Sequence, residues 1–554
     1  MRPLDWIVLV SWLVLLISYG LWRGRGSNTV NQFLLAGKTM PWYAMGLSIM
    51  ATQAGAITFI STPGQAYVDG MRFVQVYFGL PIAMVILSAT VVPIFHRAKV
   101  YTAYEYLEQR FDAKTRALVS VIFLIERGLS AGIALAAPAI VLSAILHLPF
   151  LWTSIIMGCV VILFTTMGGI KAITWADVPQ MMVILASLIL ALCIAIHLLP
   201  PGVSFLDAAK LAGAAGKLNA VVLHFDWKDR YNLWSGVIGG AFLALAYFGT
   251  DQSQVQRYLT GKSIGQSRLS LLFNAMAKVP MQFLILYIGA MVFVFFLFDK
   301  PPLLFHPVEM ARVQKTPQFP GIESRYDGAF DHRRAAALEY KDARDESSRT
   351  AAQQKFQAAQ KDLDGARADA LKLSTENDTN YIFLTFVMRY LPAGVVGLVL
   401  AVIFTAAMSS SSGEINSLAT VTVIDIYKRH FRPGASDHHY LIASRAATLF
   451  WGAFATIFAT FAYNFGALIE AVNQVGSLFY GGLLGVFVLA FFAKKVQGTA
   501  AFYGVIAGEL AIFATARFTS IKFLWYNVIG SLVVIAVALV ISKAERGNAD
   551  KLYS

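Results

Sequence analysis

The stretch Ala406-Ala407-Met408-Ser409-Ser410-Ser411-Ser412-Gly413-Glu414-Ile415-Asn416-Ser417 lies inside a long apolar run. Four consecutive hydroxyls are costly at membrane depth, because hydrocarbon offers them no water to bond. On a helix Ser409 and Ser412 share a face, and the Ala406 carbonyl lies one turn before Ser410. Such neutral oxygens suit a hard cation, and we expect sodium. The alternative is that these serines only donate back to carbonyls four residues earlier, as serines in membrane helices commonly do.

The composition is that of a membrane protein with many spans. Hydrophobic residues make up 57% of the 554 residues and charged residues 14%, with a net charge of +13. A soluble domain would carry roughly a quarter charged residues. The Lys and Arg residues are spread through short loops, which favours membrane topology over nucleic-acid binding. Cys159 and Cys193 fall in apolar runs, so neither a disulfide framework nor a metal cluster is indicated.

Thirteen apolar runs are long enough to cross a hydrocarbon core of about 30 Å. Basic residues gather in the short loops on one side, which is therefore the cytoplasm, and Arg257 is assigned to one of these loops. We expect a multi-pass protein of the plasma (inner) membrane, with the N-terminus outside and the C-terminus in the cytoplasm. The predicted spans are 5–22, 42–66, 73–95, 116–146, 150–169, 177–200, 234–259, 271–298, 393–427, 440–463, 466–493, 498–516 and 522–542.

Two predicted spans carry polar residues and glycine where an uninterrupted helix would be easier to build. Ala51–Thr58 places hydroxyl, amide and glycine groups in mid-span, and Phe248–Ser253 does the same five spans later. Matched breaks in two halves of a chain indicate a binding site near the midplane of an inverted-repeat transporter. A glycine packing contact or a simple kink is the alternative for either break.

The segment 299–378 is charged and polar, so we expect it to lie outside the membrane as a helical insertion. Phe356, Leu363 and Ala370 form a weak seven-residue stripe that we expect to pack on the protein's own surface. The expected division is a first span and cytoplasmic loop at 1–40, a five-helix repeat at 41–200, an external loop at 201–233, a second five-helix repeat at 234–493 interrupted by 299–378, and two spans with a short tail at 494–554.

Several stretches resemble the sodium/solute symporter family, whose sodium/glucose cotransporter-like members share them in the same order. The resemblance implies an all-α, LeuT-like core of five plus five helices in an inverted repeat, with broken helices at the midplane. It also implies solute uptake driven by sodium through alternating access. The stretches are Phe33-Leu34-Leu35-Ala36-Gly37-Lys38, Tyr101-Thr102-Ala103-Tyr104-Glu105-Tyr106-Leu107, Gly168-Gly169-Ile170-Lys171-Ala172 with Trp175-Ala176-Asp177-Val178-Pro179-Gln180, Asp251-Gln252 with Val255-Gln256-Arg257-Tyr258, and Gly476-Ser477-Leu478-Phe479-Tyr480-Gly481.

The resemblance also implies where the transported sodium ion binds. Some relatives have a second sodium site, whose pattern here involves Asp177 and Ser412 together with Ser409. Gly413 stands where those relatives supply another hydroxyl, so we predict one ion per solute. Asp177 alone has a second interpretation, as a helix cap. The shared site corresponds to the carbonyls of Ala51, Ala54 and Ala406 with the hydroxyls of Ser409 and Ser410.

For the solute, the resemblance points to positions used by sugar-transporting members, of which Lys278 matches outright. Arg127 lies in mid-span, where ionisable groups are usually functional. We expect Arg127, or Ser130 one turn on, to meet a substrate carboxylate; a buried ion pair with other partners is the alternative. Sugars, polyols and small organic acids all remain open. The sugar-like positions are Gln53, Thr58, Tyr77, Asp251, Lys278 and Asn473.

The sequence therefore predicts a sodium-coupled symporter that imports a small polar organic solute, with the lipid bilayer as its surroundings and a monomer as a sufficient unit. The alternative is a transporter-like sensory or binding module without net transport. Such a chain would be expected to continue into a soluble domain, whereas this one ends soon after its last predicted span. An enzyme is not expected, because the nine histidines show none of the catalytic or metal-binding spacings.

Overall fold

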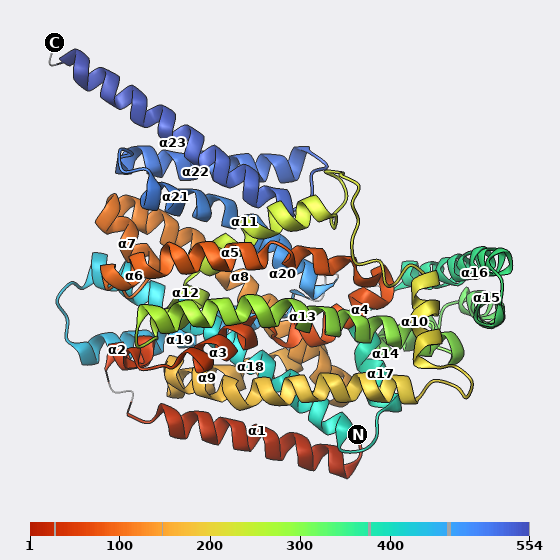
Figure 1. Cartoon of the computed structure of the whole chain (residues 1–554). Helices are drawn as coiled ribbons and strands as arrows, with labels where there is room; N and C mark the ends of the chain where they lie inside the picture. The colour runs from red at the N-terminus through yellow and green to blue at the C-terminus, as the bar shows by residue number, and fades with distance from the viewer. Residues whose placement is uncertain (27–28, 147, 375–377, 463–466, 553–554) are drawn as a thin grey trace.

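The computed structural model describes residues 1–26, 29–146, 148–374, 378–462 and 467–552. Its regular elements are all helices, and one isolated bridge pairs Met40 with Gly261. Most of the long helices run side by side along one direction (Figure 1). Residues 463–466, where two predicted spans meet, lie outside the described residues.

Within the described residues, nine helical segments are long and apolar enough to cross a membrane. A tenth crossing results if α20 (Leu468–Ser477) and α21 (Tyr480–Phe492), which meet at a bend of 44°, form one span. The nine segments are α1 (Pro3–Gly24), the run Ala56–Ala98 that contains α4 (Ala56–Asp69), η2 (Gly70–Tyr77), α5 (Leu80–Ala89) and α6 (Val91–Ala98), then α8 (Ala113–Leu146), α9 (Phe150–His197), α13 (Ile264–Phe298), α18 (Val395–Val421) continued by η5 (Thr422–Phe431), α19 (Asp437–Ala459), α22 (Gly498–Phe518) and α23 (Leu524–Leu552).

This count differs from the thirteen predicted spans where helices join or break. The predicted spans 150–169 and 177–200 form the single element α9, which contains a kink at Gly169 with φ +58°. A side chain at Gly169 would meet the Phe33 carbonyl at 2.8 Å, so this position needs glycine both for its backbone angle and for space. Conversely, the predicted span 234–259 divides into η3 (Ser235–Gly239), α11 (Gly240–Gly249) and α12 (Gln252–Leu259).

Both predicted breaks are confirmed in the structure. The first separates α3 (Trp42–Gln53) from α4 at Ala54 and Gly55, where Ala54 leaves helical geometry with ψ 47°. The second separates α11 from α12, and Asp251 caps the new helix by accepting a hydrogen bond from the Ser253 N–H at 2.8 Å. Each break frees backbone groups that a continuous helix would use internally.

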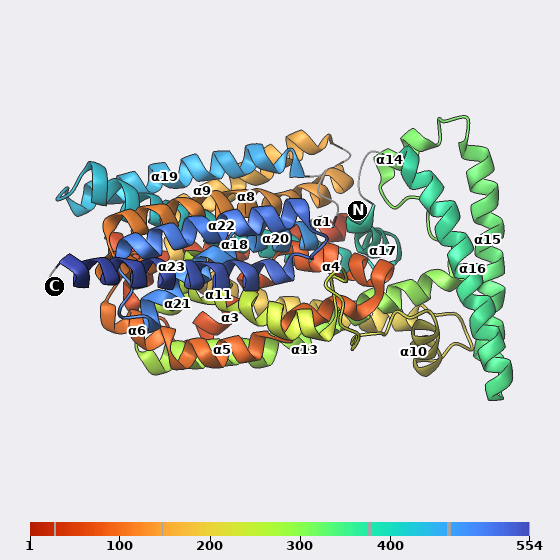
Figure 2. The ribbon, with the colours of Figure 1, turned by 90° about the horizontal axis from the view of Figure 1, so that it is seen from above.

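The insertion is helical, as predicted, and forms a hairpin of α15 (Phe319–Asp342) and α16 (Glu346–Leu373), preceded by α14 (Pro307–Val313). Figure 2 shows the hairpin standing across one end of the helix bundle. The predicted stripe of Phe356, Leu363 and Ala370 is buried. Phe356 joins the main core, whereas Leu363 and Ala370 join a small core of the insertion itself.

A buried arginine fastens the hairpin to the bundle, and a second arginine forms an ion pair within the insertion. The Arg333 guanidinium is fully buried and donates to the Phe296 carbonyl of α13 at 2.5 Å. Arg367 pairs with Asp378 at 2.5 Å. Nearby, Lys217 donates to the Val68 carbonyl at 2.5 Å, and burial lowers the pKa of this lysine to about 8.

Candidate functional site

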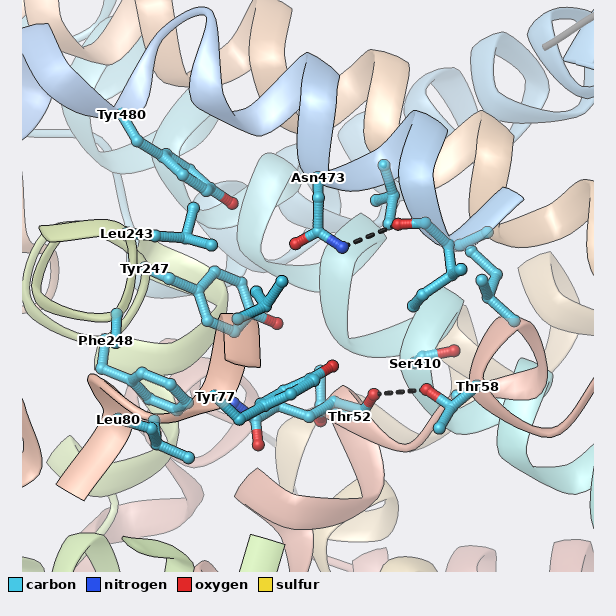
Figure 3. A pocket seen from close by; sticks show the side chains of 18 of the residues that line it. Thr52, Thr58, Tyr77, Leu80, Leu243, Tyr247, Phe248, Ser410, Asn473 and Tyr480 are labelled. Carbon is cyan, nitrogen blue, oxygen red and sulfur yellow. Dashed lines mark hydrogen bonds between the residues drawn. The ribbon is translucent and has the colours of Figure 1, made fainter. Parts of the chain in front are cut away.

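A cavity of about 130 Å³ lies beside the break between α3 and α4. Figure 3 shows rings of Tyr77, Tyr247, Phe248 and Tyr480 along one part of it, with Thr58, Ser410 and Asn473 along another. Its lining comes from elements that are far apart in sequence: Thr52, Gln53, Gly55, Ile57, Thr58, Val76, Tyr77, Leu80, Arg127, Ala134, Gly240, Leu243, Ala244, Tyr247, Phe248, Ser410, Glu414, Ile469, Val472, Asn473 and Tyr480.

The structure brings the first break and the serine run together. A Cβ on Gly55 would lie 2.8 Å from the Ser410 Oγ, so the break and α18 touch at this point. Ser410 donates to the Ala406 carbonyl at 2.9 Å. The bond to the carbonyl four residues earlier, which was the alternative interpretation, is therefore present at Ser410. The same bond holds the Ser410 hydroxyl oxygen next to the Ala406 carbonyl oxygen, as an ion site with both ligands would require. Ala51 and Ala54, in α3 and at the break, are also buried.

Adding one methyl group at this contact is expected to impair sodium dependence strongly. In Gly55→Ala the new Cβ would force the Ser410 side chain aside, although the backbone at Gly55 (φ −67°) accepts alanine. We expect the sodium concentration for half-maximal uptake to rise by about tenfold or more, because displacing Ser410 removes roughly one charge-assisted contact to the ion. Gly265→Ala on α13, whose Cβ would approach nothing closer than 3.9 Å, is the control, and an unchanged sodium dependence in Gly55→Ala would contradict the expectation.

Asp177 is not a helix cap but the centre of a buried polar cluster. Ser48 of α3 donates to its carboxylate at 2.5 Å, and Ser409 of α18 donates to it as well. The Arg257 guanidinium of α12 contacts Asp177 at 3.1 Å and also donates to Ser48. All of these side chains are buried, so the assignment of Arg257 to a cytoplasmic loop was wrong. α12 is polar in sequence, but it packs inside the protein.

The space beside Gly413 is occupied by the same arginine. A Cβ on Gly413 would lie 2.2 Å from the Arg257 Nη2. The guanidinium thus stands next to the position where a further hydroxyl was expected for a second ion. Ser412 is fully buried, and its Oγ has no hydrogen-bond partner among the described residues.

Arg127 is surrounded by acidic side chains of the protein. Its Nη1 contacts Glu414 at 3.1 Å, its Nη2 contacts Asp251 and lies 3.4 Å from Glu126, and it donates to the Tyr480 hydroxyl at 2.5 Å. Ser130 donates to Glu126 at 3.0 Å rather than reaching the cavity. The structure therefore contains the buried ion-pair arrangement that was the alternative to a substrate carboxylate.

The remaining predicted solute positions divide into two groups. Gln53, Thr58, Tyr77 and Asn473 line the cavity together with Arg127. Asn473 donates to the Ile469 carbonyl at 2.7 Å, and the Gln53 Oε1 has no partner among the described residues.

Lys278, Asp251 and Ser130 are not in the lining. The Lys278 Nζ lies 5.4 Å from the centre of the Tyr77 ring and is fully buried, so it supports this ring from outside the cavity. The lining residues that were not predicted as solute contacts include Tyr247, Tyr480 and Glu414. Tyr480 belongs to one of the family-like stretches and Glu414 to the serine-rich stretch, so the sequence marked both regions as functional. The sequence does not show which way these two side chains point.

Comparison with known proteins gives a consistent result. The model of the sodium:solute symporter family matches residues 33–313 and 362–508, more than half of the chain. The chain is 25% identical to the sodium/glucose cotransporter of Vibrio parahaemolyticus over 96% of this chain and 89% of that protein. It is 24% identical to the sodium/sialic acid symporter NanT of Aliivibrio fischeri, covering 99% and 94%. It is 27% identical to the human sodium-coupled monocarboxylate transporter 1, covering 91% and 72%.

A solved structure of a Na⁺-coupled sialic acid symporter, described as substrate-bound and outward-open, has a similar fold. The TM-score is 0.75 at 22% identity, and the match covers 98% of each chain. The gap in the family match falls in the α15–α16 hairpin, which is consistent with its description as an insertion.

Proposed function

Because the chain belongs to the sodium:solute symporter family and couples solute import to sodium, we propose that the ion binds at the α3–α4 break and the solute in the adjoining cavity. The family is one of transporters, not of enzymes. The observation that carries this assignment is the contact between Gly55 and Ser410, which joins the break to the serine run. A secondary transporter needs its ion and solute sites next to each other if one is to stabilise the other.

The proposed sodium cage consists of neutral oxygens. Carbonyl oxygens at a helix break are free to coordinate an ion, because the broken hydrogen-bond pattern no longer uses them. No carboxylate is among the proposed ligands, although Ser409 also donates to Asp177, and neutral ligands keep binding weak enough for release. The ligands are the carbonyls of Ala51, Ala54 and Ala406 and the hydroxyls of Ser409 and Ser410.

We infer that one sodium ion moves per solute. A second ion at Asp177 and Ser412 would have to share its carboxylate with Arg257, which already contacts Asp177 at 3.1 Å. Two cations at one buried carboxylate repel each other strongly in a low dielectric.

The solute is proposed to be a small polar organic molecule. The relatives named above are a glucose cotransporter, a sialic acid symporter and a monocarboxylate transporter, so the family takes solutes of different charge. Gln53, Thr58, Tyr77 and Asn473 are proposed to contact it directly, with Arg127 at the edge of the cavity. Asp251, Lys278 and Ser130 are proposed to support residues of the lining without contacting the solute: Asp251 contacts Arg127, Lys278 lies next to Tyr77, and Ser130 donates to Glu126.

The proposed architecture has thirteen crossings, with two inverted five-helix repeats at 41–200 and 234–493. Matched breaks in α3–α4 and α11–α12 support the repeat. The N-terminus is proposed to lie outside and the C-terminus in the cytoplasm of the inner membrane, which places the 299–378 hairpin outside. Three further segments flank or link the repeats: 1–40, 201–233 and 494–554. A single chain contains both the ion site and the solute site, so a monomer is proposed to be sufficient.

The test of this proposal is Ser410→Ala in proteoliposomes. Losing one ligand oxygen without adding bulk is expected to raise the sodium concentration for half-maximal uptake by about threefold to tenfold, equivalent to roughly one hydrogen-bond-sized interaction. Ser417→Ala is the matched control, because Ser417 donates back to the Glu414 carbonyl at 2.7 Å on the same helix. Wild-type sodium dependence in Ser410→Ala would show that the hydroxyl is structural. Solute binding without uptake by the wild type would favour the binding-module alternative.

A further inference from the structure

The charge around Arg127 is not balanced. Three carboxylates, those of Glu126, Asp251 and Glu414, lie within 3.4 Å of one guanidinium, and all four side chains are buried. The neighbouring pair of Asp177 and Arg257 is neutral by itself. A surplus of negative charge in a low-dielectric site is costly, so it is relieved either by a proton on one of the carboxylates or by a cation that accompanies them.

Lys278 does not remove this surplus from the cavity. Its Nζ faces the Tyr77 ring from outside the lining, and it forms no salt bridge among the described residues. Even if its charge is counted, the carboxylates of the cluster outnumber the cations. The guanidinium of Arg127 is therefore already compensated by the protein and offers little attraction to an anionic solute.

Of the three carboxylates, Glu414 is the one that belongs to the cavity lining. Its Oε1 binds Arg127 at 3.1 Å, whereas its Oε2 is buried and has no partner among the described residues. Glu414 lines the cavity, one helical turn beyond Ser410 on α18. A carboxylate oxygen without a partner, on a residue that lines the cavity, favours a ligand with a hydrogen-bond donor that reaches it when a side chain of the wall shifts.

Aromatic rings line the same part of the cavity. Figure 3 shows Tyr247 and Tyr480 in this part of the cavity. The Tyr247 ring centre lies 5.5 Å from the Arg127 guanidinium carbon and 6.0 Å from the Tyr480 ring centre. Tyr77 lines the cavity as well. Ring faces combined with a carboxylate are the usual surroundings of ammonium groups, because the ring quadrupole and the anion both attract a cation.

We propose that the transported solute carries a positively charged amine, which donates to Glu414 and packs against the rings of Tyr77, Tyr247 and Tyr480. The inference rests on the proposed function and names the solute class of the same cavity. Gln53, with its unpartnered Oε1, and Asn473 then contact the polar remainder of the solute. The amine compensates one of the surplus carboxylates, so that binding of the cation stabilises the cluster.

The experiment uses three small probes of equal length, propylammonium, propanol and propionate, on the purified full-length protein in sodium. At equal concentration and ionic strength, we expect propylammonium to raise the melting temperature and the other two to leave it unchanged. The expected preference in apparent affinity is about tenfold or more for the amine. Glu414→Gln is expected to reduce this preference to near one, whereas Glu414→Asp, which keeps the charge, retains most of it.

Glu509→Gln is the matched control, because Glu509 is another membrane carboxylate without a partner among the described residues, and it lies on α22 outside the cavity lining. If Glu414→Gln does not fold, Tyr247→Leu replaces it and is expected to weaken the amine preference through the loss of the ring. Equal or stronger stabilisation by propanol or propionate, no stabilisation by any probe, or an amine preference that survives both variants would overturn the proposal.

Failure of this inference is distinguishable from failure of the proposed function. Each probe is also titrated with sodium replaced by potassium. Sodium-dependent binding of propanol or propionate would overturn the amine alone and leave sodium coupling in place. Responses that are the same in sodium and potassium for every probe would count against the sodium site next to the cavity.

Discussion

One sodium ion is expected to enter with each solute molecule, so that a reversal-potential titration in proteoliposomes gives a slope of one. Moving one charge across 100 mV releases about 2.3 kcal/mol, and a tenfold sodium gradient adds about 1.4 kcal/mol. One ion therefore supplies about 3.7 kcal/mol and limits a neutral or zwitterionic solute to about 500-fold accumulation. Two ions would supply about 7.4 kcal/mol and raise the limit to more than about 10⁵.

The physical reason for a single ion is the position of Arg257, whose guanidinium contacts Asp177 and fills the space beside Gly413. The measurement finds the solute gradient that stops net uptake at each imposed sodium gradient. A potassium gradient of the same size is the control and is expected to have no effect. A slope of two would mean that Asp177 releases Arg257 and holds an ion with Ser412 during the cycle.

Removing Arg257 alone is expected to be the most destabilising single change at the site. In Arg257→Met the Asp177 carboxylate stays buried among Ser48 and Ser409 without its cation. Loss of one partner of a buried ion pair costs about 3–5 kcal/mol, because the remaining charge is uncompensated. The free energy of unfolding, measured by denaturant titration of the purified protein in detergent, is expected to fall by this amount.

The double variant Asp177→Asn with Arg257→Met separates the ion pair from general packing. Replacing both charges removes the uncompensated carboxylate, so we expect the double variant to recover at least half of the lost stability. If the double variant is no more stable than Arg257→Met, the arginine acts through its packing against Gly413 and not through its charge. The same variants, tested in the reversal-potential assay, show whether a freed Asp177 accepts sodium.

The features that the sequence predicted correctly depend on local physics. The breaks at Gly55 and Asp251 follow from polar residues and glycine in apolar runs, and the serine run is costly in lipid at any position. The hairpin of α15 and α16 follows from helix-forming composition. None of these predictions needed knowledge of which helices are neighbours.

The features that the sequence did not predict depend on distant partners. Arg257 lies at the end of the predicted span 234–259 and was counted as a basic loop residue, but its partner Asp177 lies 80 residues away in the chain. Arg127 is 287 residues from Glu414. Lys278 was predicted as a solute contact, yet it lies next to Tyr77 and outside the cavity lining, because the direction of a side chain depends on packing between α13 and η2.

The hydrogen bond between Arg333 and the Phe296 carbonyl joins α15 to α13, so a rotation of α13 would also move the hairpin. From Arg333 to the end of α15 at Asp342 the helix extends on the order of 14 Å at 1.5 Å per residue. A 10° rotation of α13 carried through this joint would shift the end of α15 by roughly 2.5 Å, because the displacement grows with the arm. A fluorophore placed at this end would report rotation of α13 without any label near the cavity.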